Sequence, residues 1–561
     1  MKKRLTALVC ALALLFAGAA VLPQGVTLFD TSISVSADEE IGDFTCFMSK
    51  DKATQEYNVW IRKYNGNAQN LVIPEELTIY SHTLKVYGLD SKAFKDNTTL
   101  RSVTMPSSLR VISSQCFEGC TSLKTVSLNE GLKTIDHSAF KNCTALSSVA
   151  IPSSVTSISI FAFYNTGLEE FTLPSTVTDI DTGILHSCQS LKKVTLPDSL
   201  EEVPDSIVQN CTALTTVNIP KNCKKICGGA FLGCTSLKSV TIPSTVTEIS
   251  TGAFNGCTGL TSVTIPNSVT LLGNYAFYGC TALKKVTLPD SITAIPKYCF
   301  ADCDSLSDIN IPKNLETLGD YAFANCKALK KVTLPDNITA IPDYCFCYCE
   351  SLSEINIPKN LETLGDYAFY CCTALKKVTL PDSITAIPES CFCGCESLSD
   401  INMPKNLRTI DHDAFAFCNS LTSVTLPDTV TMAHISAFNL CDNLEKVVYP
   451  RSVVDFGGEE FGAFQSDATT YYCYRDSAAH KCFEEKGARY AFIGEGRKKG
   501  DYNGDGVIGI DDLSVIKKKM INLINLTGED FNVMDVNSDG VINLNDLTAM
   551  KRHMLNVKKL W

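Results

Sequence analysis

A unit of 23 residues, repeated through most of this chain, restricts its fold more than any other feature. The unit has the form L-x-x-V-x-[IL]-P-x-x-[VIL]-x-x-[IL]-x-x-x-[AC]-F-x-x-C. A unit this short cannot bury its own apolar face, so its copies must stack on one another in a solenoid. The phenylalanine position is filled by Phe94, Phe117, Phe140, Phe163, Leu185, Val208, Phe231, Phe254, Phe277, Phe300, Phe323, Phe346, Phe369, Phe392, Phe415, Phe438 and Phe461, with one deletion near Gly167.

Each unit contains two extended segments and one compact segment. The stretch Val286-x-Leu288-Pro289 predicts a short parallel strand with two inward side chains, and proline ends it because it has no N–H to donate. The segment Ile292–Ile295 predicts a second strand on the opposite wall. The three-residue spacing of Phe-x-x-Cys-x-x-Leu predicts a tight helical turn.

The N-terminus predicts export. Lys2, Lys3 and Arg4 precede the apolar run Leu5–Leu22, which is typical of a secretory signal peptide, here residues 1–37 with cleavage after Val35-Ser36-Ala37. An earlier cut after Ala17-Gly18-Ala19 and a retained membrane anchor are the alternatives. The net charge of −12 argues against nucleic-acid binding, which needs a basic stripe that this sequence does not show. We therefore expect a secreted, extracellular protein without a membrane span in its mature form.

The cysteines follow the repeat rather than a disulfide pattern. Stacking places fourteen of them in one column, each about 5 Å from two equivalent neighbours, so that no pairing is preferred. We expect reduced thiols bonded to backbone carbonyls, with Asn97 taking the same position in the first coil. A metal cluster at Cys345-x-Cys347-x-Cys349 is disfavoured, because alternate residues point to opposite sides. The column comprises Cys120, Cys143, Cys188, Cys211, Cys234, Cys257, Cys280, Cys303, Cys326, Cys349, Cys372, Cys395, Cys418 and Cys441.

The two ends of the repeat region predict caps. The alternating segment Tyr57–Tyr64, followed by a turn signal, predicts a strand of an N-terminal cap with a first degenerate coil, residues 43–89. The repeat and the entry IRKYNGNAQNLVIP resemble the BspA-like leucine-rich repeats of bacterial surface proteins. That resemblance implies an α/β repeat solenoid with a parallel β ladder over residues 90–464. It also implies a closing cap, residues 465–493, in which a strand, a helix over Ser477–Lys486 and a final strand follow one another. Whether Cys473 and Cys482 pair there stays open.

Two outward columns define what the solenoid presents. Lys285, Asp308, Lys331, Glu354, Lys377 and Asp400 alternate in sign beside a polar Thr/Asn column, which predicts a self-satisfied sheet face. A tyrosine stripe lies two residues before the phenylalanine position. It either binds sugar rings or a protein partner, or its rings stack on one another after duplication of the block Ala282–Cys326. The stripe comprises Tyr275, Tyr298, Tyr321, Tyr344 and Tyr367.

After a polar linker, residues 494–500, the composition changes. The segments 501–512 and 535–546 are twelve-residue loops in which positions 1, 3 and 5 supply side-chain oxygens, position 7 a carbonyl and position 12 a carboxylate. Such oxygen sets bind Ca²⁺, so we expect two ions. The expected ligands are Asp501, Asn503, Asp505, Val507, Gly509 (through water), Asp512, Asp535, Asn537, Asp539, Val541, Asn543 and Asp546. The following helices carry matched apolar residues that predict packing on one another: Leu513, Ile516 and Met520, and Leu547, Met550 and Met554.

Residues 501–561 resemble a type I dockerin, because no helix leads into the first loop and Asp takes position 12. The resemblance implies a small all-α calcium-binding domain that binds a cohesin domain of a cellulosome-like scaffold, in either of two orientations. Gly509 departs from the usual Asn or Asp, and the absence of a Ser-Thr pair leaves the cohesin type open. The implied cohesin-facing residues are Ile510, Asp511, Lys517, Lys518, Leu544, Asn545, Lys551 and Arg552.

Three functions fit this sequence. The first is a non-catalytic binding or adhesion subunit whose solenoid presents a protein- or carbohydrate-binding surface. The second is an enzyme of polysaccharide or peptide breakdown, but the seven histidines form no metal spacing and no catalytic motif interrupts the repeat. The third is a purely structural spacer, about 85 Å long at ~4.8 Å per coil.

Overall fold

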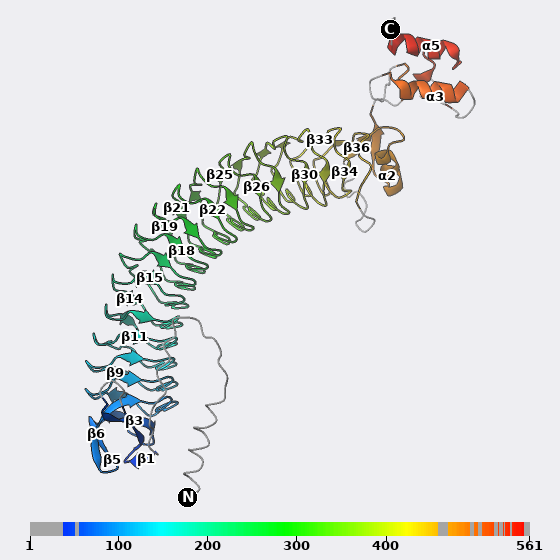
Figure 1. Cartoon of the computed structure of the whole chain (residues 1–561). Helices are drawn as coiled ribbons and strands as arrows, with labels where there is room; N and C mark the ends of the chain where they lie inside the picture. Colours follow the sequence, from blue (N-terminus) through cyan, green and yellow to red (C-terminus); the bar gives the residue numbers. More distant parts are fainter. Residues whose placement is uncertain are drawn as a thin grey trace.

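The computed structural model is a curved solenoid with a small helical module at its C-terminal end (Figure 1). It describes residues 38–50, 55–457, 469–493, 499–502, 508–520, 526, 531, 533–538 and 541–554. The expected signal peptide, Phe461, the linker residues 494–498 and four expected calcium ligands (Asn503, Asp505, Val507 and Asp539) lie outside this range.

The N-terminal end is covered by antiparallel strands. β1 (Glu39–Ile41), β2 (Phe44–Lys50) and β3 (Tyr57–Tyr64) pair in order, and β3 occupies the segment in which the alternating pattern predicted a strand. β5 (Glu76–Ile79) and β6 (His82–Leu89) form a hairpin beside them. Parallel pairing of β3 with β6, and of β6 with the next strand, continues this cap into the solenoid.

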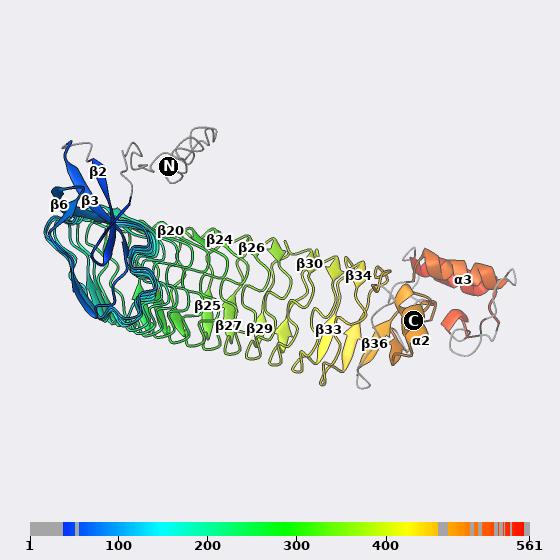
Figure 2. The same ribbon diagram turned by 90° about the horizontal axis from the view of Figure 1, so that it is seen from below.

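Most coils contribute a short strand to each of two parallel ladders on opposite walls (Figure 2), but the coil around Val240 has no strand in the first ladder and the coil around Ser148 only a bridge. In the first ladder Val286 and Leu288 point inward and are buried, as predicted. The first ladder comprises β4 (Asn70–Val72), β7 (Ser102–Thr104), β9 (Thr125–Ser127), β12 (Glu170–Thr172), β14 (Lys193–Thr195), β16 (Thr216–Val217), β19 (Ser262–Thr264), β21 (Lys285–Thr287), β23 (Asp308–Ile309), β25 (Lys331–Thr333), β27 (Glu354–Asn356), β29 (Lys377–Val378), β31 (Asp400–Ile401), β33 (Ser423–Thr425) and β35 (Lys446–Val448). The second comprises β8 (Val111–Ile112), β10 (Thr134–Ile135), β11 (Ser157–Ile158), β13 (Asp179–Ile180), β15 (Glu202–Val203), β17 (Lys225–Ile226), β18 (Glu248–Ile249), β20 (Leu271–Leu272), β22 (Ala294–Ile295), β24 (Thr317–Leu318), β26 (Ala340–Ile341), β28 (Thr363–Leu364), β30 (Ala386–Ile387), β32 (Thr409–Ile410) and β34 (Met432–Ala433).

The phenylalanine segment is a series of turns rather than the expected helical turn. Alternate amides bond to the next coil, as when Phe277 N donates to Cys299 O at 2.9 Å. The amides between them stay within the coil, as when Tyr278 N donates to Tyr275 O at 3.2 Å. The backbone is left-handed on both sides of the phenylalanine, with φ of +59° at Tyr275 and +67° at Gly279. We call this stack of turns the turn column, and it forms a third set of bonds between coils.

Phenylalanine rings and thiols fill the core of the turn column. Successive rings stack face to face, for example Phe277 on Phe300 at 5.5 Å with planes 6° apart. Each of the fourteen column thiols donates to the carbonyl of the preceding coil's Phe-position residue, at 3.1 to 3.3 Å. All described cysteines are free thiols, including Cys473 and Cys482. The expected reduced thiols bonded to carbonyls are therefore confirmed, but Asn97 instead accepts from the amides of Thr99 and Leu100.

The C-terminal cap has the predicted order of elements. β36 (Thr470–Cys473) pairs with β35, and β37 (Tyr490–Phe492) pairs with β36. Between them α2 (Ala478–Lys486) begins after Ser477, whose hydroxyl accepts from His480 N, and ends at Gly487. None of the described helices has the length and apolar content needed to cross a bilayer.

Candidate metal centre and docking surface

The C-terminal module contains two similar loop-and-helix units. α3 (Ile510–Met520) and α5 (Leu544–Met554) contact each other over a small core that includes Leu513, Ile516, Leu547 and Met550. Four of the six residues predicted to form the helix–helix face are therefore buried. Met520 and Met554 are exposed instead, because each lies in the last turn of its helix.

The aspartate at loop position 12 ties each loop together. Asp512 is 1% exposed, and its two carboxylate oxygens accept from Tyr502 N at 2.9 Å and Gly509 N at 2.7 Å. In the second unit Asp546 is fully buried and accepts from Val536 N at 2.8 Å and Asn543 N at 2.9 Å. In both units the carboxylate thus connects loop positions 2 and 9.

The position-1 residues Asp501 and Asp535 are also buried, so each loop encloses two carboxyl groups. Enclosing charged carboxylates is costly unless a cation or hydrogen bonds offset the lost hydration. Oxygen-rich loops of this kind suit Ca²⁺. Within the described residues no three His, Cys, Asp or Glu side chains converge as a metal site, and the loop residues 503–507 and 539–540 are not among those described. The residues that are described fit a calcium loop.

The two units differ at position 9. Asn543 donates from its amide nitrogen to Val541 O at 3.2 Å and accepts from Asn545 N at 2.7 Å. Gly509 has no side chain to place there. At position 9 the second loop is therefore braced by a side chain, whereas the first loop has only a glycine backbone there.

The units are joined at the start of their loops. Gly500 N donates to Val533 O at 2.8 Å, and Lys499 Nζ donates to Asp535 O at 2.8 Å. Gly500 has a φ of +91°, and a Cβ there would lie 3.2 Å from Met550 Cγ. Residue 500 must therefore be glycine, because its backbone is left-handed and because a Cβ would crowd the core of the module.

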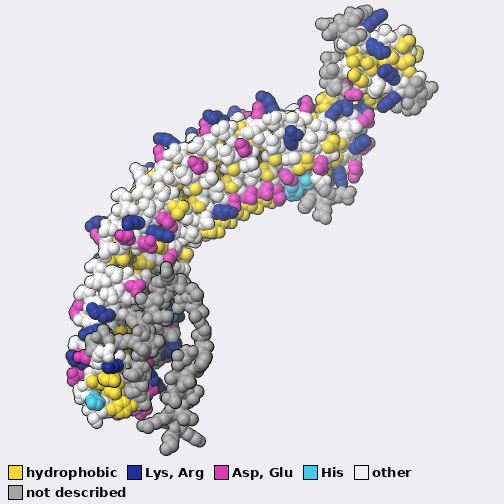
Figure 3. Space-filling model, in the orientation of Figure 1, with side chains coloured by type: hydrophobic (Ala, Val, Ile, Leu, Met, Phe, Trp, Pro, Cys, Tyr) yellow, Lys and Arg dark blue, Asp and Glu magenta, His cyan; other side chains and the backbone are white. Residues whose placement is uncertain are grey.

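An apolar residue at loop position 10 is strongly exposed in both units: Ile510 is 77% exposed and Leu544 61%. The basic pairs Lys517–Lys518 and Lys551–Arg552 are exposed on the same helices, as are Asp511 and Asn545. Hydrophobic and basic side chains lie side by side on this module in Figure 3. All eight residues expected to face a partner are therefore accessible.

The tyrosine stripe forms a continuous stack. Adjacent rings of its five members lie 4.5 to 4.7 Å apart with planes 2° to 8° apart. Tyr278 contacts one end of the stack edge-on, and Tyr370 contacts the other end with its ring tilted by 58°. The central rings cover Ala301, Ala324 and Cys347. Because the ring faces are occupied by neighbouring rings, only edges and hydroxyls face solvent.

On the first ladder, the charged column forms the pairs Lys285–Asp308 (2.7 Å), Lys331–Glu354 (2.9 Å) and Lys377–Asp400 (2.7 Å). The asparagines of the polar column do not simply face solvent. Asn310 accepts from Leu288 N at 2.8 Å and donates to Leu288 O at 2.7 Å. Asn356 and Asn402 do the same with Leu334 and Leu380. Sequence reasoning missed this role, although the Thr/Asn alternation carried the signal.

These features define a leucine-rich-repeat solenoid followed by a two-loop helical module. The family model described as BspA type leucine rich repeat region matches residues 64–191, 156–281, 226–353 and 339–469, so the chain belongs to that family. The model described as Dockerin type I domain matches residues 499–555.

Among solved structures, the first of the three below supports the leucine-rich-repeat fold, and the other two are reported as similar. A leucine-rich repeat protein from Bacteroides ovatus is 28% identical with a TM-score of 0.55, covering 72% of this chain and 95% of that one. A leucine rich cell surface protein from Faecalibacterium prausnitzii is 26% identical with a TM-score of 0.39, covering 65% and 94%. A leucine-rich repeat protein from Eubacterium ventriosum is 22% identical with a TM-score of 0.41, covering 58% and 92%. A search of curated proteins finds no match.

Proposed function

We propose that this protein is a secreted, non-catalytic binding subunit of a cellulosome-like assembly. Its dockerin module docks, in a calcium-dependent manner, onto a cohesin domain of a scaffold, and the solenoid presents a binding surface to a protein or polysaccharide. The observation that carries this proposal is the matched exposure of Ile510 and Leu544 beside basic helix residues in a module that matches the dockerin family. Exposed apolar side chains with a polar rim are typical of protein interfaces.

Calcium would stabilise the module by neutralising its enclosed carboxylates. Asp501 and Asp512 would hold it in the first unit, and Asp535, Asn537, Asn543 and Asp546 in the second, together with the remaining loop positions. The ion supplies structure here rather than chemistry. Since Asp512 and Asp546 each close a loop and begin a helix, losing the ion loosens both helices that carry the docking residues.

The test is binding of the full chain to a panel of cohesin domains, by calorimetry, with Ca²⁺ and with excess EDTA. We expect binding to at least one cohesin in Ca²⁺ and none in EDTA. The variant Asp512→Asn with Asp546→Asn should reproduce the EDTA result, and Asp476→Asn in the C-terminal cap is the matched control. Failure of every cohesin to bind in Ca²⁺ would refute docking.

A structural spacer is the second candidate. It is favoured by the stacked tyrosines and the internally paired charges, which leave the solenoid faces largely satisfied. Pull-down of polysaccharides and of cell-surface proteins with the full chain separates the two. Retention of a ligand that the Tyr321→Ala variant fails to retain supports the binding subunit, and retention of none supports the spacer.

A further inference from the structure

The second ladder is interrupted at four prolines. It breaks before β15, β22, β26 and β30, and each of these strands is followed directly by proline: Pro204, Pro296, Pro342 and Pro388. In other coils the residue at this position donates to the preceding coil, as Gly319 N does to Ile295 O at 2.8 Å. Proline has no N–H, so the bond cannot form.

The first ladder is interrupted at five places, one between β9 and β12 and the other four at asparagines. Pairing stops after the strands at Asn218, Asn310, Asn356 and Asn402. In a continuous stretch the backbone carbonyl of the next coil accepts, as Thr287 O does from Ile265 N at 2.9 Å. At Asn310 the side-chain oxygen accepts from Leu288 N instead. The asparagine side chain thus takes up the last bond to the preceding coil. The strand that precedes the asparagine does not pair with any strand of the following coil.

Between residues 282 and 419, all of which are described, the two kinds of interruption coincide. They separate the two coils of residues 328–373 from the coils on both sides. The neighbouring two-coil blocks, residues 282–327 and 374–419, stay joined to the coils beyond them through β19–β21 and β32–β34. Both ladders are continuous inside each block, and neither connects β23 and β24 to β25 and β26, or β27 and β28 to β29 and β30. The prolines recur every 46 residues, so the block is also the unit of sequence duplication.

Inside a block the two coils are closely packed. A Cβ on Gly319 would lie 2.4 Å from Lys297 N, and one on Gly365 would lie 2.3 Å from Asp343 N. All ion pairs between coils of this region join two coils of the same block. Across the second junction the acids Asp366 and Glu389 lie near each other, and burial with nearby Asp343 and Glu389 raises the pKa of Asp366.

The blocks are joined mainly along the turn column. Across the first junction Phe323 N donates to Cys345 O at 2.9 Å and Cys349 Sγ to Phe323 O at 3.2 Å, while Tyr321 stacks on Tyr344 at 4.5 Å. At the second junction Ser390 replaces the next tyrosine, and Tyr367 donates to Glu389 Oε1 at 2.6 Å. On the ladder side a cleft of about 560 Å³ spans β25, β27 and β29.

We propose that the two junctions, between residues 327 and 328 and between 373 and 374, are hinges at which the solenoid yields block by block. At each hinge the coils stay bonded along the turn column, and they separate along the two ladder walls. In a chain that is bound to a scaffold, such hinges would let the solenoid bend or extend under tension while the coils inside each block stay folded. This inference does not depend on the identity of the scaffold or of the ligand.

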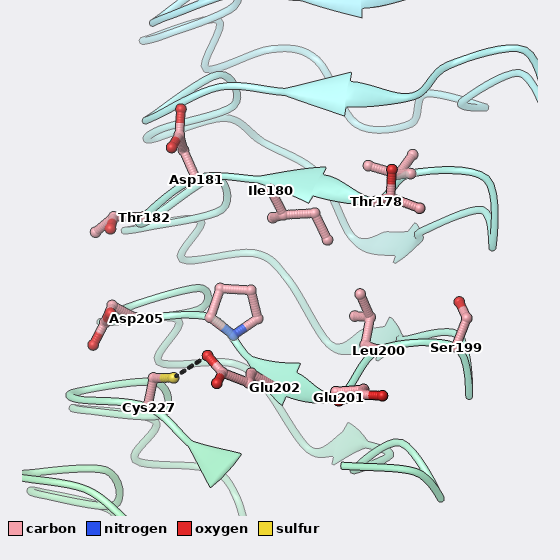
Figure 4. A pocket seen from close by; sticks show the side chains of 12 residues that line it. Thr178, Ile180, Asp181, Thr182, Ser199, Leu200, Glu201, Glu202, Asp205 and Cys227 are labelled. Carbon is pink, nitrogen blue, oxygen red and sulfur yellow. Dashed lines mark hydrogen bonds between the residues drawn. The ribbon is translucent and has the colours of Figure 1, made fainter. Parts of the chain in front are cut away.

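Pro204 offers an internal comparison. The same missing rung there leaves a cleft of about 450 Å³ between β13 and β15, seen in Figure 4. The first ladder is continuous across that junction through β12 and β14. One interrupted ladder opens a gap, and only a double interruption makes a hinge.

The test is stretching of the full chain in an optical trap, with handles at its two termini. We expect the block 328–373, which both junctions bound, to extend as a separate step of 46 residues, about 160 Å of contour length. Steps of one coil, about half as long, or release of the whole solenoid in a single event would overturn the proposal.

Repair of one junction provides the second arm. Pro342→Ser supplies a backbone N–H at residue 342, as Ser250 does at the equivalent position of its own coil. Asn310→Thr introduces the residue type that Thr287 and Thr333 have at the equivalent position. In the double variant we expect the separate 46-residue step to disappear, because residues 328–373 are then joined to the coils that precede them. Pro204→Ser is the control, expected to leave the steps unchanged. If the double variant has the circular dichroism spectrum of the original chain but its steps are unchanged, the hinge assignment is overturned. If the double variant does not fold, stretching of the unmodified chain still tests the blocks.

Discussion

The thiol of Cys280 donates a hydrogen bond of 3.2 Å to the carbonyl oxygen of Phe254, one coil earlier in the solenoid. Both residues are fully buried, and the same carbonyl also accepts from Cys257 N at 3.1 Å. The thiol therefore has two roles. It fills space beneath the stacked phenylalanines, and it satisfies the second lone pair of a carbonyl that water cannot reach.

Replacement of this thiol separates the two roles. Cys280→Ala removes the donor and leaves a small void, so we expect a loss of about 1–3 kcal/mol in the free energy of unfolding. Cys280→Ser keeps a donor and should be less destabilised. Urea denaturation followed by circular dichroism measures both, and equal losses in the two variants would show that the hydrogen bond contributes little.

The buried thiols also predict a stability that falls at alkaline pH. Burial raises the pKa of Cys257 to about 12 and that of Cys280 well above its ordinary value. These thiols stay protonated in the folded chain but ionise once unfolded, so their contribution is fully present below the pKa of an unfolded thiol, roughly 8.5, and is lost as pH rises toward 12.

Urea midpoints at pH 7, 8.5 and 10 test this dependence. The expected decline is about 1.4 kcal/mol per pH unit for each such thiol above pH 9. The variant with Cys257→Ala and Cys280→Ala is the control, and its decline should be shallower. A decline of equal slope would assign the effect to other groups.

Much of the solenoid follows from sequence because its period repeats the same evidence many times. The buried phenylalanines, the inward Val286 and Leu288 and the thiol column were all predicted from spacing. Leu185 and Val208 keep their buried positions across the deletion, which shows that the slot requires apolar volume rather than an aromatic ring.

What the sequence did not reveal depends on how neighbouring coils pair. Pro342 and Asn310 each look like ordinary surface residues of one coil, and their effect on both ladders emerges only when the coils are stacked. The left-handed backbone at Tyr275 was also missed, because non-glycine residues seldom adopt it. In the C-terminal module, the exposure of Met520 and Met554 depended on where each helix ends.

The tyrosine stack should contribute to stability whether or not it binds a ligand. Tyr321 lies between Tyr298 and Tyr344, at 4.5 Å from each. Tyr321→Ala removes two stacked contacts, worth about 1–3 kcal/mol together, whereas Tyr321→Phe keeps both rings in contact and should change the free energy of unfolding by less than about 0.5 kcal/mol. Thermal and urea unfolding of the two variants compare them. A neutral alanine variant would indicate that the stripe is kept for binding rather than for stability.

Removing calcium should affect the two parts of the chain differently. The solenoid is held by backbone ladders, stacked rings and thiols that involve no metal, whereas each loop of the module encloses two carboxylates. In EDTA we expect the helical signal of α3 and α5 to fall, while the near-ultraviolet signal of the tyrosine stack persists. Hydrogen exchange resolved along the chain measures this. Faster exchange throughout residues 282–419 would contradict it.

The matched surfaces of the two units predict redundancy in docking. Ile510 and Leu544 occupy equivalent positions and are both exposed, and the residues around them correspond one for one. If a cohesin accepts either unit, Ile510→Asp alone should weaken binding by no more than about two-fold, the statistical loss of one of two orientations. Leu544→Asp alone should behave alike, whereas the double variant should lose at least ten-fold, about 1.4 kcal/mol. Calorimetry with the same cohesin in Ca²⁺ compares all three, with Asp476→Asn in the C-terminal cap as the control. A single variant as damaged as the double variant would show that one orientation alone is used, and would identify the unit that carries it.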